Sequence, residues 1–298
     1  MSQVVPSMRR ILLLGCRGQV GWELQRALAP LGMVVARDYP EVDLAQVDQL
    51  VTLVRETNPD VIVNAAAYTA VDRAEQEPEK ARLINAVAPA RLAALARERR
   101  SWLVHYSTDY VYDGSKRTPY EESDPPCPLN VYGQTKLEGD LAITTSGCPF
   151  LIFRLCWVYG TRGHNFLLTI QRLARERETL RVVADQIGSP TWSRWIAETT
   201  AQALGQVLAQ PDPGRWSGIY HLRAAGQTSW HGFARRIVDL MPVAERRCRE
   251  VVPIRSEEYP SPARRPAWSV MSCEKLWRTF RLALPDWETG LLQALDMS

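Results

Sequence analysis

Residues 11–21, ILLLGCRGQVG, decide the fold. The four apolar residues at the start lack polar alternation, which predicts a strand buried on both faces, as in a parallel sheet. Three glycines follow directly. Gly15 permits a tight turn, Gly18 lets the backbone approach a pyrophosphate, and Gly21 allows the following helix to pack closely. A helix N-terminus also offers N–H groups to phosphates. The segment therefore predicts a strand, a phosphate-binding loop and a helix.

The alternation of apolar runs and helical patterns continues along the first half of the chain. Apolar runs occur at 11–14, 32–36, 61–63, 102–104 and 150–153, and helical patterns at 20–28, 47–56, 81–99 and 132–143. This alternation predicts an α/β fold, a Rossmann-type doubly wound parallel sheet.

The regular alternation of strand and helix patterns ends at about residue 160. Helical patterns at 165–177 and 195–208 are separated by stretches rich in proline and glycine. We predict a dinucleotide-binding domain at 8–160 and a second, smaller α/β substrate domain, mainly at 161–298. Interleaving of the two, and a single continuous domain, stay open.

Composition sets further limits. The 298 residues are 46% hydrophobic and 23% charged with a net charge of +3, typical of a globular protein and too weakly basic to indicate nucleic acid. The six cysteines lack metal-ligand or paired spacing, so we expect free thiols in a reducing compartment. Residues 1–10 lack a secretory signal, and no apolar run is long enough to span a membrane. We therefore expect a cytoplasmic protein.

The cofactor expectation depends on the end of the second apolar run. Asp38 lies about 20 residues beyond the glycines, the position from which a carboxylate contacts the adenosine ribose. Arg37 beside it, or Arg17 in the loop, would instead suit a 2′-phosphate. Both NADPH and NADH stay open.

Two tyrosine–lysine pairs have the same spacing, Tyr112–Lys116 and Tyr132–Lys136. Asp113, a glycine and a serine separate the first pair, and these residues favour a turn. The second pair begins a run of helix formers, where a spacing of four residues puts both side chains on one face. We predict that Tyr132 and Lys136 are the catalytic pair.

This pair suits the reduction of a ketone. A tyrosine has an ordinary pKa near 10, and a lysine cation beside it in a shielded cleft would bring that pKa toward 7, so that the phenol donates a proton more readily. Ser107 and Thr108 follow the fourth apolar run, at the edge where ligands bind in doubly wound sheets. We expect Thr108 to supply a hydroxyl to the substrate oxygen.

At this point the chain resembles the extended short-chain dehydrogenase/reductase family. The resemblance rests on the segments ILLLGCRGQVGWELQRAL, PDVIVNAAAYTAVDRAE, HYSTDYVYDG, PLNVYGQTKLEGD, FRLCWVYG, DQIGSPT, YPSPARRP and LPDW. It implies reduction of dTDP-4-dehydro-L-rhamnose at C4 by NADPH or NADH, the last step of dTDP-L-rhamnose synthesis.

The resemblance also implies roles for individual residues. Tyr132 would be the proton donor, Lys136 its partner and Thr108 the hydroxyl at C4. The residues implied to bind the cofactor are Gly15, Gly18, Gln19, Val20, Gly21, Asp38, Asp43, Leu44, Ala67, Tyr68, Thr69, Tyr106, Tyr132 and Lys136. Those implied to bind the sugar nucleotide are Thr108, Asp109, Trp157, Arg264 and Arg265, the two arginines as phosphate partners.

Some members of this family bind Mg²⁺ through glutamates at a dimer interface. Glu23 matches one such position, but Arg194 stands at the second, and arginine cannot ligate Mg²⁺. We therefore predict no metal site and leave a homodimer open. Two other functions stay open: a nucleotide-sugar epimerase or dehydratase, for which Asp109 would add an acid, and a non-catalytic regulatory subunit that binds NADP.

Overall fold

A single parallel sheet forms the centre of the molecule in the computed structural model, which describes residues 8–210 and 212–296. Its six strands lie in the order β10-β5-β4-β3-β1-β2. Their bounds are β1 Arg10–Leu14, β2 Met33–Arg37, β3 Val61–Asn64, β4 Trp102–Thr108, β5 Phe150–Leu155 and β10 Gly218–Leu222. The doubly wound α/β sheet predicted from sequence is confirmed, with the strand order changing direction between β1 and β3.

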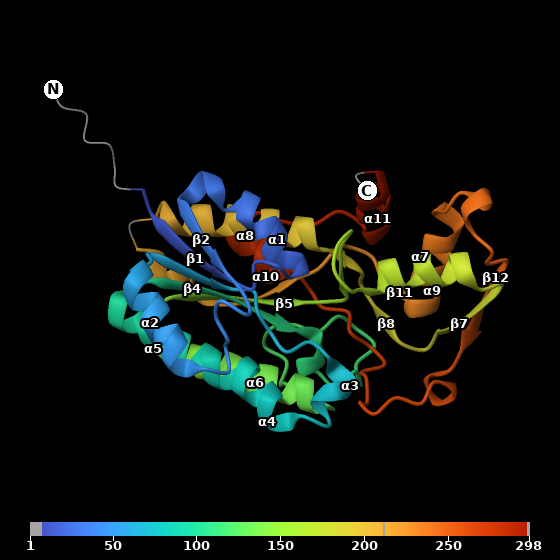
Figure 1. The fold of residues 1–298 in the computed structure, drawn as a ribbon, viewed down its shortest axis with the longest axis horizontal. Helices are drawn as coiled ribbons and strands as arrows, with labels where there is room; N and C mark the ends of the chain where they lie inside the picture. The colour runs from blue at the N-terminus through green and yellow to red at the C-terminus, as the bar shows by residue number, and fades with distance from the viewer. Residues whose placement is uncertain (1–7, 211, 297–298) are drawn as a thin grey trace.

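Helices cover both faces of this sheet (Figure 1). On one face lie α1 (Gln19–Ala27) and α8 (Ser193–Leu208), and on the other α2 (Val47–Thr57), α5 (Ala88–Arg99) and α6 (Val131–Thr144). Ile11 and Leu13 of β1 belong to the apolar core under α1 and α8, whereas Leu12 and Leu14 belong to the core under α2 and α5. The strand is buried on both sides, which explains its uninterrupted apolar run.

One predicted helix differs from the structure. The pattern at 81–99 forms α4 (Pro78–Arg82), a π-helical turn at Leu83–Val87 and then α5. Pro89 has no N–H to donate to the carbonyl of Asn85, so a regular helix cannot continue through this point. The turn instead directs the Asn85 side chain into the protein, where it hydrogen-bonds both backbone groups of Tyr68.

The C-terminal part adds a smaller layer beside the sheet. The paired strands β7 (Thr179–Val183) and β12 (Glu250–Ile254) pack with α7 (Phe166–Glu176) and α9 (Trp230–Leu240). The remaining elements are β6 Val158–Tyr159, β8 Ile187–Gly188, β9 Thr191–Trp192, β11 Thr228–Ser229 and α11 Trp287–Asp296, together with α3 Val71–Ala74, which contacts α6, and α10 Glu274–Phe280, which packs on β10 of the main sheet. Because β10 pairs with β5, the C-terminal half also supplies a strand to the main sheet; the domain division at residue 160 stays a prediction.

Two further observations concern the sequence expectations. No helix among residues 8–210 and 212–296 is long and apolar enough to cross a membrane. The expectation that residues 1–10 contain no secretory signal falls largely on residues 1–7, outside the described residues. All six cysteines are free thiols.

Candidate active site

The glycine-rich loop joins β1 to α1 in a shape that requires its glycines. Gly15 has φ +79°, and a side chain there would meet the backbone of Ala66 at 2.5 Å. A side chain at Gly21 would meet the carbonyl oxygen of Gly15 at 1.9 Å. Gly18 is exposed at the N-terminus of α1, whose first N–H groups have no partner within the helix. Gln19 adds a buried Oε1 atom without a hydrogen-bond partner. This cradle fits a dinucleotide phosphate.

Asp38 lies immediately after β2, beside the glycine loop. Its carboxylate accepts hydrogen bonds from the backbone N–H groups of Arg17, at 2.7 Å, and Tyr39, at 2.8 Å. The Arg17 guanidinium contacts the Tyr39 carbonyl and Glu41. Asp38 therefore ties the loop to the end of β2, and Arg17 is held at the place where a ribose or its phosphate would lie.

The other residues implied to bind a cofactor follow the same edge of the sheet. Asp43 and Leu44 come after β2, and 67–69 come after β3. Leu44 is buried, whereas Thr69 is exposed. Tyr106 lies within β4, and its hydroxyl donates to Thr200 of α8 at 2.9 Å. These positions share the carboxyl edge of the sheet, where ligands bind in this fold.

Tyr132 and Lys136 lie one turn apart on α6. The helix begins after Asn130, whose side chain accepts a hydrogen bond from the N–H of Gly133 at 2.8 Å. A side chain at Gly133 would meet the Tyr110 carbonyl oxygen at 2.2 Å, so this glycine allows α6 to approach the end of β4 closely. The structure confirms the helical setting that distinguished this pair in the sequence.

Thr108 ends β4 and faces the Tyr132 phenol. Burial raises the pKa of Tyr132 to about 12, while a hydrogen bond with the Thr108 hydroxyl opposes that rise. The expectation that Lys136 brings this pKa toward 7 is not met in this structure, because burial penalises the phenolate more than its surroundings stabilise it. The Tyr132 phenol is therefore protonated at neutral pH.

Lys136 is almost completely buried, with 1% of its surface exposed. Its Nζ donates to the Tyr106 carbonyl at 2.6 Å and lies 3.0 Å from Nε2 of His105. Burial lowers the pKa of Lys136 to about 8, and the nearby Asp140 carboxylate opposes this change. Asp140 is itself buried and accepts from Ser107 at 2.8 Å and Arg154 at 3.2 Å.

Asp109 lies against the back of Thr108. Its Oδ1 accepts the Thr108 hydroxyl at 3.1 Å, and its Oδ2 lies 3.6 Å from the Cys156 thiol. Burial raises the pKa of Asp109 to about 6, and hydrogen bonds from Ser269 and Thr108 oppose that rise. Asp109 is only 2% exposed and bonds the Thr108 hydroxyl directly, so its carboxylate orients that hydroxyl.

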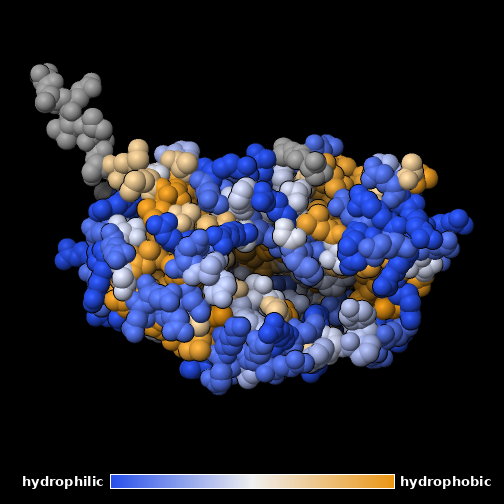
Figure 2. All heavy atoms as spheres, in the orientation of Figure 1, coloured by the Kyte–Doolittle hydropathy of each residue, from blue (hydrophilic) through white to orange (hydrophobic). Residues whose placement is uncertain are grey.

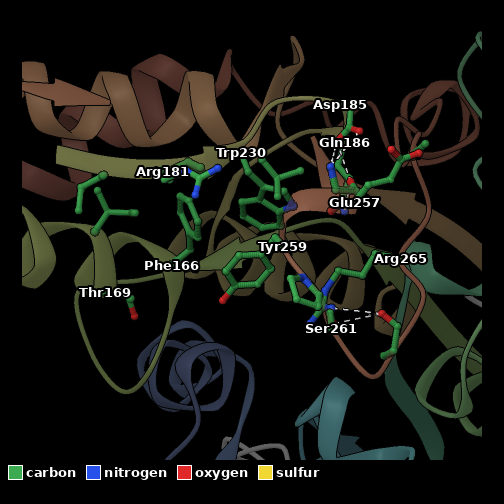
Figure 3. A pocket seen from close by; sticks show the side chains of 18 of the residues that line it. Phe166, Thr169, Arg181, Asp185, Gln186, Trp230, Glu257, Tyr259, Ser261 and Arg265 are labelled. Atoms are coloured by element: carbon green, nitrogen blue, oxygen red, sulfur yellow. Dashed lines mark hydrogen bonds between the residues drawn. The ribbon is translucent and has the colours of Figure 1, made fainter. Parts of the chain in front are cut away.

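A cleft of about 1090 Å³ opens in the C-terminal layer. Figure 2 shows this face of the molecule hollowed near its middle. In Figure 3 the rings of Phe166, Trp230 and Tyr259 gather in the cleft, with Arg265 nearby. The residues from α7, β7 and the 256–267 segment line it, Arg264 included.

One contact links the cleft to Tyr132. Tyr110 packs edge-on against Tyr132, with ring centroids 5.5 Å apart, and hydrogen-bonds Arg265 of the cleft. Arg265 also donates to Asp72 at 2.8 Å and to Ser261. The Arg264 side chain is exposed.

Trp157 borders the cleft through Trp230. It stacks on Trp230 with ring centroids 3.5 Å apart, and its φ of +44° is unusual for a residue with a large side chain. Gly188 makes room for the indole, because a side chain there would meet the Trp157 ring at 2.3 Å. The DQIGSPT segment thus holds one wall of the cleft in place.

The positions implied for Mg²⁺ do not fit a metal. Glu23 pairs with Arg26 at 2.7 Å, and Arg194 pairs with Glu198 at 3.1 Å. Within the described ranges, no group of three or more histidine, cysteine, aspartate or glutamate side chains is arranged to hold a metal ion.

The sequence interpretation missed several site residues. His105 and Asn64 lie in buried strands, and the sequence does not show which groups their polar side chains contact. Asp140 had a signal, because it lies four residues after Lys136 on the same helix. Trp230 comes from a distant segment and could be assigned to the cleft only from the fold.

The glycine loop, the parallel sheet and the group of Thr108, Tyr132 and Lys136 are the features of the short-chain dehydrogenase/reductase class. A family model described as the RmlD substrate binding domain matches residues 8–298. The chain belongs to this family.

Named relatives agree with this assignment. A dTDP-4-dehydrorhamnose reductase of Burkholderia thailandensis is 50% identical over 286 residues, covering 93% of this chain and 95% of that protein. One from Escherichia coli is 45% identical over 295 residues, covering 96% and 97%. The crystal structure of the Bacillus anthracis dTDP-4-dehydrorhamnose reductase in complex with NADP is 33% identical, with a TM-score of 0.88, covering 98% of this chain and all of that one (100%).

Proposed function

We propose that this chain reduces dTDP-4-dehydro-L-rhamnose at C4 to dTDP-L-rhamnose with NADPH or NADH. The observation that carries the proposal is the grouping of partly buried Tyr132 with buried Lys136 and Thr108 at the carboxyl edge of the sheet, beside a glycine cradle suited to a dinucleotide. The relatives' names supply the particular sugar nucleotide.

The chain's own residues have the following proposed roles. A bound nicotinamide cofactor supplies a hydride. Tyr132 gives its proton to the C4 oxygen and becomes a phenolate, while the Thr108 hydroxyl, turned away from Asp109, donates to the C4 oxygen. The Lys136 ammonium lowers the cost of that negative charge inside a buried site.

The sugar nucleotide would occupy the cleft beside these residues. Phe166, Trp157, Trp230 and Tyr259 offer aromatic surfaces for a base and a deoxysugar. Arg265 and Arg264 offer guanidinium groups to the diphosphate. For Arg265 this requires exchange of its contact with Asp72.

We extend the proposal to the setting of the enzyme. A cytoplasmic location suits its six free thiols and its nucleotide-sugar substrate. A homodimer is compatible with the chain, and because Arg194 replaces a ligand, it would form without a shared Mg²⁺.

The direct test is to supply dTDP-4-dehydro-L-rhamnose with each reduced cofactor and to follow nicotinamide oxidation together with the sugar product. We expect one cofactor oxidised per sugar reduced. Conversion of the sugar without net cofactor oxidation would indicate an epimerase. An absence of turnover together with a stoichiometric protein partner would indicate a regulatory subunit.

The cleft has its own test in Arg265→Ala. We expect the KM for the sugar nucleotide to rise by about tenfold, because a charged hydrogen bond to a phosphate is lost, while the cofactor Kd is unchanged. An equal loss of both affinities would reject the diphosphate role. Arg175→Ala is the matched control, since Arg175 pairs with Glu245 on the outer surface.

A further inference from the structure

Lys136 is backed by a buried chain of polar groups that extends across the sheet. Its Nζ lies 3.0 Å from Nε2 of His105 in β4, and Nδ1 of His105 lies 3.2 Å from Nδ2 of Asn64 in β3. His105 and Asn64 are 0% and 1% exposed. Water therefore cannot substitute for a missing partner, and each hydrogen bond in the chain needs one donor and one acceptor.

The Asn64 amide is held in one orientation. Its Oδ1 accepts the backbone N–H of Ala66 at 3.2 Å, so its Nδ2 is the group that faces His105. An amide nitrogen only donates, and Nδ1 of His105 must therefore accept. Burial, followed by the nearby Lys136 charge, holds the pKa of His105 well below its usual range, so the ring is neutral and carries one proton. That proton lies on Nε2, directed at Lys136.

This arrangement conflicts with a charged lysine. An ammonium group has three donors and no acceptor, so it cannot accept the Nε2–H of His105. A neutral amine can accept it and still donate to the Tyr106 carbonyl. For Lys136 to be an ammonium, the His105 proton must move to Nδ1, and the Asn64 amide must turn so that its oxygen faces the ring. The turn sacrifices the hydrogen bond to Ala66.

We propose that His105 and Asn64 form a tautomer switch that sets the charge of Lys136. With the proton on Nε2 the lysine is a neutral amine, and with the proton on Nδ1 it is an ammonium. The switch itself does not depend on the proposed function. Its effect on catalysis does rest on that function, because the ammonium is the form that supports proton donation by Tyr132. His105 and Asn64 act through Lys136 and are positioning residues.

Other charged groups also act on Lys136. Asp140 acts on it from its own helix α6, where Tyr132 lies one turn before it, and Arg154 of β5 partly neutralises Asp140 at 3.2 Å. From β4 the titratable neighbour is His105. Asp140 favours the ammonium, whereas burial and the Nε2–H of His105 favour the amine. Since burial lowers the pKa of Lys136 to about 8, the two forms exchange near neutral pH.

Nuclear magnetic resonance of the His105 ring tests the switch without any turnover. The chain has four histidines, and the His105 signals are those absent from His105→Gln. We expect the ring to change from the Nδ1–H to the Nε2–H tautomer between about pH 6 and pH 10, as the lysine loses its proton. A single tautomer across this range overturns the proposal, even if the protein is an active reductase. A tautomer change in a protein without this reductase activity would reject the proposed function alone.

Asn64→Asp gives a second, kinetic test. The new carboxylate accepts from both Ala66 and Nδ1–H of His105, which fixes the tautomer that accepts from an ammonium. We expect the alkaline limb of kcat/KM to move up by at least about one pH unit, a tenfold change in the lysine equilibrium. Asn58→Asp is the control, because this exposed residue ends α2 far from the site, and its limb should not move. If Asn64→Asp folds and the alkaline limb of its kcat/KM profile does not move, the switch is contradicted. If the variant does not fold, the tautomer measurement on His105 is the test of the switch.

Discussion

The two tyrosine–lysine pairs of this chain have identical spacing and lie in different structures. Tyr132 and Lys136 share a face of α6, and both are in contact with the end of β4. Tyr112 and Lys116 lie in a loop whose Gly114 has φ +74°. There Tyr112 is buried, while Lys116 turns outward to Asp124 at 2.6 Å. The spacing of two residues has chemical meaning only when the backbone between them is known.

The second pair has a structural role of its own. The Tyr112 hydroxyl lies 2.8 Å from both Nη1 of Arg154 and Nε2 of His221, and its ring stacks on Tyr120 at 4.2 Å. Arg154 also pairs with Asp140, so Tyr112 belongs to a buried network behind the catalytic helix. Tyr132 is expected to act on substrate, and Tyr112 to satisfy buried charge.

The largest expected effect is that of Tyr132→Phe. Loss of the proton donor should lower kcat by about 10²–10⁴-fold, the usual contribution of general acid catalysis. Cofactor affinity should change little, because the ring remains. Rapid-mixing kinetics and cofactor titration measure the two quantities. Unchanged turnover in a folded variant would remove Tyr132 from the mechanism and with it the contrast between the pairs.

Thr108→Val should have the next largest effect. Valine keeps the shape but removes the hydroxyl that bonds Tyr132 and Asp109, and we expect kcat to fall by about 10–100-fold. Thr108→Ser retains the hydroxyl and should keep most of the activity. If Thr108→Val keeps full activity, the hydroxyl has no role in the reaction.

Tyr112→Phe should affect stability rather than chemistry. It removes one buried hydrogen-bond partner from Nη1 of Arg154 and one from Nε2 of His221, which costs about 1–3 kcal/mol of unfolding free energy. Turnover should be nearly unchanged. Denaturant unfolding measures the first and steady-state kinetics the second. Tyr220→Phe is the control, because its hydroxyl contacts the Trp216 carbonyl at 2.8 Å and its loss should cost less. A fall in kcat as large as that of Tyr132→Phe would mean that the pairs were assigned the wrong way round.

The comparison of the two pairs shows which features of the fold and site could be predicted from the sequence. Local signals were enough for five of the six strands of the sheet, the glycine loop and the helix of Tyr132, because apolar runs and glycine spacing reflect contacts within a short stretch of chain. The interruption at Leu83–Val87 depended on Pro89, a signal that was present but not used. The partners of Lys136 could not be predicted, since His105 and Asn64 come from two different strands. Strand pairing brings them together, and a single sequence does not specify which polar side chains then meet.

The smallest expected effect is that of Lys116→Met. The pair with Asp124 is short, but its side chains keep 32% and 24% of their exposure, so water already screens both charges. We therefore expect a loss of less than about 1 kcal/mol and no change in kcat. Lys136→Met makes the same chemical change at the other pair, where the lysine is buried beside the reacting phenol, and there kcat should fall steeply. Measuring both variants for unfolding and turnover compares the pairs directly. Equal losses of kcat would show that both lysines take part in the reaction. We do not expect this result, because the Lys116 side chain is partly exposed and pairs with Asp124.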